Sequence, residues 1–177
     1  MPEGCEKMSK QGDAAYAWFL KGYNCSQSVV AAFAPQIGLT EETALRLSAG
    51  FGAGIGRMRE VCGAFCGVVT VLSMVYADPA DPKDKSRMYA LVQEAAEQYR
   101  SRNGGSIICR SCWQRRVLLL LGARRQRTAP QTIIKSAPAR SCAASAPTCV
   151  QNLLRRTRRD GTDYIRRMRK CSLSNWN

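Results

Sequence analysis

The sequence contains no histidine. Histidine is the usual general base near neutral pH, a common zinc ligand and the last residue of the CxxCH motif that attaches c-type haem. Its absence excludes Ser-His-Asp and Cys-His catalysis, histidine-ligated zinc and a c-type haem motif. Chemistry in this protein must therefore depend on other side chains.

Long apolar runs are also scarce. The longest extends from Val61 to Ala77, and its 17 residues lie at the lower limit for a membrane-spanning helix. The polar start of the chain, MPEGCEKMSKQGDAA, lacks the apolar stretch of a secretory signal. We therefore expect no membrane span and a cytoplasmic protein whose cysteines are reduced at rest.

Acidic residues are rare in the C-terminal part of the chain. Residues 1–110 carry 12 Lys and Arg against 11 Asp and Glu, whereas residues 111–177 carry 15 Lys and Arg against two Asp and no Glu. Almost all of the net charge of +14 therefore belongs to the last 67 residues. This asymmetry predicts a domain over residues 1–110 and an Arg-rich tail over residues 111–177, which on composition is disordered or poorly packed.

The pattern of residues 1–110 is helical. Apolar side chains recur at spacings of three and four, and capping residues or glycines separate the segments. Asn24 and Thr40 are placed to cap two helices, and Asp81-Pro82 to open another. We predict an all-α fold, an irregular bundle of four to five helices over residues 14–21, 25–36, 41–49, 57–76 and 82–102.

Cysteine, in contrast, is abundant, with nine in 177 residues. Cys25 begins a predicted helix, where the helix dipole and free backbone N–H groups lower the pKa of a thiol. Cys62 and Cys66 are four residues apart and are predicted to share one helix face. Gly63 and Gly67 have the same spacing and would let another backbone approach that face. The spacing of this cysteine pair suits a disulfide within one helix poorly, so partners are expected from other segments.

Three stretches of the sequence together resemble the C_GCAxxG_C_C family of redox-active proteins. They are GYNCSQSVVAAF around Cys25, GFGAGIGRMREVCGAFCG around Cys62, and SIICR around Cys109. They cover roughly residues 13–110, in the expected order. The resemblance implies a small helical protein with an undefined redox role, similar in fold to part of the split-Soret cytochromes and often encoded near transporter genes. It also implies that Cys25, Cys62 and Cys109 are three of four hallmark cysteines, and that Cys66 fills a variable position.

The chain departs from this family pattern at the fourth hallmark cysteine. After Cys109-Arg110 the family continues with a Glu-Leu-Leu-like helix and later an Arg-Pro-Cys segment, whereas SCWQRR follows here. With suitable synonymous codons, the neighbouring reading frame of this tail restores both pieces in order. We infer that residues 111–177 are the product of a one-nucleotide frameshift in the source sequence.

The leading functional interpretation is a redox-active protein. Cys25, Cys62 and Cys109 would act as catalytic thiols in thiol/disulfide exchange, or as ligands of a metal ion or iron-sulfur cluster. Cys25 would be the most acidic thiol, Cys62 its partner, and Cys109 a third ligand or resolving thiol. The sequence identifies neither the redox partner nor the cofactor, and it leaves open whether the protein is an enzyme.

Two other interpretations remain open at the level of sequence. One is a non-catalytic binding module whose basic tail contacts nucleic acid without sequence preference, or an acidic membrane surface. The other is a structural protein whose cysteines fill the core, as buried thiols commonly do. The redox interpretation predicts that the three hallmark thiols converge. The frameshift predicts few contacts between residues 123–177 and the core, and no approach of Cys142, Cys149 or Cys171 to the cluster.

Overall fold

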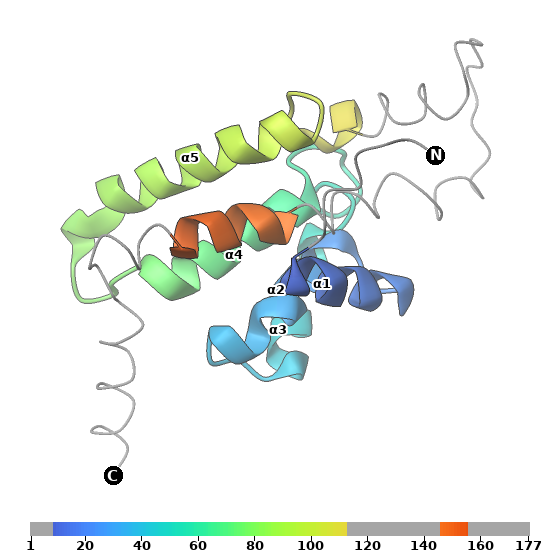
Figure 1. Cartoon of the computed structure of the whole chain (residues 1–177), viewed down its shortest axis with the longest axis horizontal. Coiled ribbons are helices and arrows are strands. Elements are labelled where there is room, and N and C mark those ends of the chain that lie inside the picture. Colours follow the sequence, from blue (N-terminus) through green and yellow to red (C-terminus); the bar gives the residue numbers. More distant parts are fainter. Residues whose placement is uncertain (1–8, 113–145, 156–177) are drawn as a thin grey trace.

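The computed structural model describes residues 9–112 and 146–155, and most of this part is helical (Figure 1). The α-helices are α1 (Lys10–Leu20), α2 (Cys25–Phe33), α3 (Glu41–Leu47), α4 (Gly63–Tyr76) and α5 (Lys85–Arg102). Short 3₁₀ turns, η1 (Ala34–Gln36), η2 (Ala49–Phe51) and η3 (Pro82–Asp84), lie between them. A single antiparallel bridge between Val61 and Ile108 is the only extended pairing within the described ranges. The predicted all-α fold is confirmed.

The helices form two groups around one apolar core. Figure 1 shows α4 and α5 running side by side, with α1, α2 and α3 gathered near one end of this pair. Helix α2 joins the groups, because it packs against both α1 and α4. Phe65 and Tyr99 hold α4 against α5 through rings whose centroids are 5.4 Å apart. None of the described helices combines the length and apolar character that crossing a membrane requires.

The starts of α2 and α3 are determined by their capping residues, as predicted. The Asn24 side chain accepts hydrogen bonds from the backbone N–H groups of Ser26 and Gln27, both at 3.0 Å. The Gln27 side chain in turn accepts from the Asn24 N–H at 3.1 Å, which completes a capping box. Thr40 caps α3 in the same way.

Helix α1 begins four residues earlier than predicted. Its cap is Ser9, whose hydroxyl accepts from the Gly12 N–H at 3.1 Å, and Asp13 lies in the first turn instead. At the other end of the domain, the predicted start at Asp81-Pro82 is a 3₁₀ turn, and α5 proper follows from Lys85.

The largest error of the sequence prediction concerns the start of α4. The segment was predicted to be helical from residue 57, but α4 begins at Gly63. Residues 53–57 all have positive φ, between 54° and 78°, and Arg59 has φ of 65°. Left-handed backbone costs roughly 1–2 kcal/mol per non-glycine residue and cannot continue into a right-handed helix. Cys62 therefore lies at the N-cap of α4, and not on a helix face with Cys66.

A second correction concerns the tail. Residues 146–155 form a helix, and Ala146, Cys149, Val150 and Leu153 are at most 1% exposed and belong to the core. Figure 1 shows this segment alongside α4. The four positions have the spacing i, i+3, i+4, i+7 of an amphipathic helix, which composition alone concealed. The prediction of few contacts from residues 123–177 is thus wrong for this segment, and Cys142 and Cys171 lie outside the described residues.

The frameshift stays a prediction for the tail. Sequencing the source DNA across codons 108–115 should reveal a one-nucleotide difference from the frame translated here. Restoring the other frame should supply the missing Arg-Pro-Cys and raise both the free energy of unfolding and the solubility. If the DNA encodes the printed tail without a shift, the frameshift is wrong and the packed helix over residues 146–155 is native.

Candidate functional site

Three cysteines from three segments meet between α2, α4 and the residues that follow α5. Cys25 is the first residue of α2, Cys62 caps α4, and Cys109 begins a helical segment over residues 109–112. Cys25, Cys62 and Cys109 are only 7%, 4% and 9% exposed. The Cys25 and Cys109 thiols both hydrogen-bond to Cys62. We call these three residues the thiol cluster, and Cys62 is its centre.

The antiparallel bridge positions Cys62 beside Cys109. The Cys62 N–H donates to the Ile107 carbonyl at 2.8 Å, and the Cys109 N–H donates to the Glu60 carbonyl at 2.6 Å. This pairing fixes two segments that are more than 40 residues apart in sequence. No periodicity predicts it, since the bridge is too short to leave an alternating pattern.

Two glycines of α4 allow α2 to come close, as the sequence predicted. A Cβ at Gly63 would lie 2.8 Å from the Cys25 sulfur and in contact with the Phe51 carbonyl oxygen. A Cβ at Gly67 would lie 2.9 Å from the Cβ of Val29. Only glycine at these positions lets Cys25 reach the start of α4.

Cys62 also contacts a residue that sequence reasoning missed. The Tyr99 hydroxyl of α5 donates a hydrogen bond to the Cys62 sulfur at 3.2 Å, and Tyr99 is fully buried. A buried tyrosine normally requires a partner for its hydroxyl. No local signal in the sequence identified that partner, because it depends on the packing of α5 against α4.

The left-handed segment supplies donors to the other two sulfurs. The Ala53 backbone N–H bonds to Cys25, and the Arg59 guanidinium bonds to Cys109. Gly54 packs so closely that a Cβ there would lie 2.6 Å from the Cβ of Cys109. Each sulfur of the thiol cluster thus has one donor of its own besides the neighbouring thiols.

The environment of Cys25 corrects the prediction that it is the most acidic thiol. Its pKa is raised well above the ordinary value, first because its thiol donates to Cys62, then because burial penalises the thiolate, and because negative charge on Cys62 repels a second charge. The Ala53 N–H acts in the opposite direction but does not compensate. The start of α2 does not outweigh burial in the cluster.

The pKa of Cys109 is raised by the same causes. The hydrogen bond to Cys62 comes first, then burial, then the charge of Cys62, while the hydrogen bond and positive charge of Arg59 oppose them. Outside the cluster, burial raises the pKa of Cys66 and of Cys149 to about 11. In all three thiols of the α4 region, charge is disfavoured while Cys62 carries it.

The described residues were also considered as a ligand set for a metal. Within residues 9–112 and 146–155, no group of three or more Cys, Asp or Glu side chains has an arrangement that could hold a metal ion. The cluster described above is one of hydrogen-bonded thiols around a central sulfur.

These features define the class of protein, a helical one with a buried, cysteine-centred site. Residues 23–155, about three quarters of the chain, match the family model described as "Putative redox-active protein (C_GCAxxG_C_C)". The chain therefore belongs to the C_GCAxxG_C_C family, as its three cysteine motifs indicated. Neither a curated protein nor a solved structure matches the chain.

Proposed function

We propose that this protein transfers electrons by thiol/disulfide exchange, with Cys62 as the sulfur shared by two possible disulfides. The observation that carries the proposal is that the Cys25 and Cys109 thiols both hydrogen-bond to Cys62. Either neighbour is therefore placed to become its disulfide partner after a small adjustment. Cys25 and Cys109 have no comparable bond to each other among the causes that shift their pKa values.

The first step is attack on an external disulfide, and Cys109 is suited to it. Cys109 is the most exposed of the three residues, and Arg59 stabilises negative charge on its sulfur. Because its thiol already donates to Cys62, the Cys62 sulfur is placed to accept the proton. The Cys109 sulfur bonds to one sulfur of the substrate, the substrate S–S bond breaks, and one substrate thiolate leaves.

The second step closes the disulfide within the protein. Cys62 loses its proton to solvent or to the departing thiolate and attacks the Cys109 sulfur, which releases the second substrate thiolate. In sum, two protein thiols give up two electrons and two protons, and the substrate disulfide becomes two thiols. Tyr99 holds the Cys62 sulfur through this sequence, and Cys25 can replace Cys109 as its partner by a further exchange.

We further propose that the protein acts in the cytoplasm. Such a compartment keeps structural disulfides rare and exchange-active thiols reduced. A cluster of buried thiols that can be oxidised and reduced without any change in fold suits that setting. Binding of a metal ion or iron-sulfur cluster by the same cysteines is the competing chemistry, and it is an outcome of the test below.

The test is disulfide mapping of the full chain. Fully reduced protein is treated with glutathione disulfide, quenched with acid and digested, and the cross-linked peptides are identified by mass spectrometry. We expect Cys62–Cys109 or Cys62–Cys25 linkages to dominate, with Cys66 remaining free. A parallel sample of reduced protein is titrated with Co²⁺, whose thiolate complexes absorb strongly in the near ultraviolet.

Two results would overturn the proposal. One is oxidation that leaves Cys62 free while other cysteines pair. The other is tight Co²⁺ binding by the three cluster cysteines together with resistance to oxidation, which would assign the site to a metal.

A further inference from the structure

We propose that the disulfide substrate is anionic, and that arginines on the edge beside Cys109 recognise it. This inference rests on the function proposed above and names its substrate class. The edge consists of residues 57–60 and 108–110, which the bridge of Val61 to Ile108 brings side by side. We call it the arginine edge.

Backbone pairing places the charges of the two segments together. The Arg110 N–H donates to the Arg59 carbonyl at 3.2 Å, one step beyond the bond between Cys109 and Glu60. Arg57 and Arg110 are exposed, and Arg59 is half-buried against Cys109. Three arginines oppose the one acidic residue of these segments, Glu60, so the edge has a net charge of +2.

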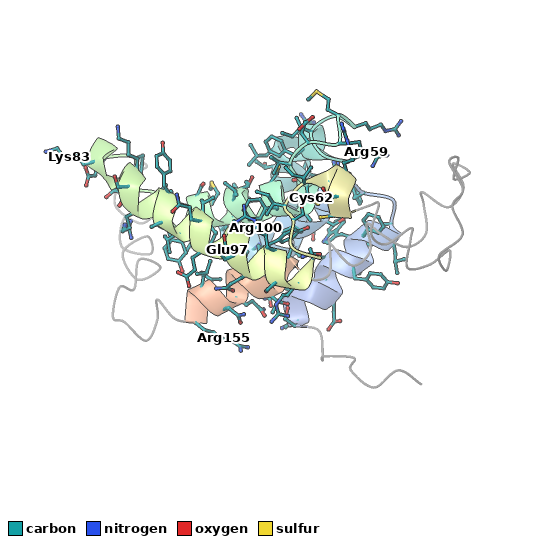
Figure 2. The ribbon with its side chains drawn as sticks, turned by 90° about the horizontal axis from the view of Figure 1, so that it is seen from above. Arg59, Cys62, Lys83, Glu97, Arg100 and Arg155 are labelled. Carbon is teal, nitrogen blue, oxygen red and sulfur yellow. The ribbon has the colours of Figure 1, made fainter. Side chains whose placement is uncertain are left out.

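The charge is localised where the chemistry requires it. Residues 1–110 as a whole are nearly neutral, so the arginine edge is a local excess and not part of a generally basic domain. Figure 2 shows Arg59 and Cys62 at the same end of the molecule, with Lys83 at the opposite end. A local positive potential raises the concentration of an anionic substrate near the reacting sulfur and speeds its capture.

The edge also offers apolar contact. Met58 is 59% exposed and Ile108 is 36% exposed, although both are large apolar side chains. They flank Arg59 in the sequence of one segment and Cys109 in the other. A substrate that combines carboxylates with an apolar or aromatic body therefore fits better than a small neutral disulfide.

Two aromatic disulfides test the inference. Dithiobis(nitrobenzoate) carries two carboxylates, whereas dithiodipyridine is uncharged at neutral pH. The rate of mixed-disulfide formation at Cys109 is followed with each probe by quenching and peptide mapping. The ratio of the two rates is then divided by the same ratio for mercaptoethanol, which removes the intrinsic reactivity of the probes.

At low ionic strength we expect this normalised ratio to be about five- to tenfold in favour of the anionic probe, falling towards unity in concentrated salt. Arg57→Gln and Arg110→Gln should each lower it about twofold, and Glu60→Gln should raise it. Lys83→Gln, at the far end of the molecule, is the matched control and should leave the ratio unchanged. The rate with dithiodipyridine should stay constant in every variant and so reports correct folding.

A normalised ratio near one, or a ratio that the two arginine variants do not move, would overturn the inference. Either result would leave the proposed exchange chemistry intact, because disulfide mapping with glutathione disulfide tests that separately. Conversely, a protein that forms mixed disulfides at Cys109 but never closes an internal disulfide would contradict the proposed function alone.

Discussion

Replacing Cys62 by serine should abolish disulfide formation in the thiol cluster. Both possible disulfides contain this sulfur, so the variant leaves Cys25 and Cys109 without the partner to which each is hydrogen-bonded. Counting free thiols after treatment with glutathione disulfide should show a loss of two thiols in the unaltered protein and no paired loss in Cys62→Ser. A mixed disulfide should still form at Cys109 and accumulate, because nothing resolves it.

The other single variants separate the central sulfur from its neighbours. Cys25→Ser should retain the Cys62–Cys109 disulfide, and Cys109→Ser should retain the slower Cys25–Cys62 route. Cys66→Ser is the matched control, since Cys66 is half-buried one turn along α4 and should not affect either route. Normal oxidation of Cys62→Ser, in a protein with unchanged helical circular dichroism, would show that Cys62 is not the centre of the chemistry.

Replacing Gly63 by alanine should destabilise the protein and disturb the cluster. Alanine has the better helix propensity by roughly 1 kcal/mol, so local preference favours the change. The new Cβ, however, would lie 2.8 Å from the Cys25 sulfur and against the Phe51 carbonyl, and the latter is backbone that cannot rotate away. Overpacking of this kind typically costs about 1–3 kcal/mol, which we expect to appear as a lower free energy of unfolding in urea.

Gly50→Ala provides the control for that measurement. A Cβ at Gly50 would have no neighbour within 4 Å, and its φ is not positive. We expect its free energy of unfolding to change by less than about 0.5 kcal/mol. If Gly63→Ala proved as stable as Gly50→Ala, the close approach of α2 to α4 at the cluster would be wrong.

Local signals were sufficient for most helix boundaries of the domain. Asn24 and Thr40 cap α2 and α3 because their side chains satisfy N–H groups within three residues, and such interactions are visible in sequence. The start of α4 was not predictable in this way. A run of apolar and small residues after residue 57 resembles a helix, but five consecutive left-handed residues precede it. The packing of this segment on the cysteines stabilises that backbone.

The tail shows the opposite limitation. Composition predicted poor packing for all of residues 111–177, yet residues 146–155 bury one face in the core. The stripe formed by Ala146, Cys149, Val150 and Leu153 was present in the sequence, but the surrounding arginines and the abrupt change in charge dominated the reading. Periodicity over ten residues was a better guide here than composition over 67.

The sequence by itself determined that the protein is helical, that it belongs with the C_GCAxxG_C_C proteins, and which three cysteines carry their motifs. The tertiary structure decided the order among those cysteines. Helix dipoles act within one turn of the chain and favoured Cys25, whereas burial and the donors around Cys62 arise only when α2, α4, α5 and the bridge come together. Since desolvation of a buried thiol outweighs a helix terminus, Cys62 and not Cys25 is the centre of the cluster.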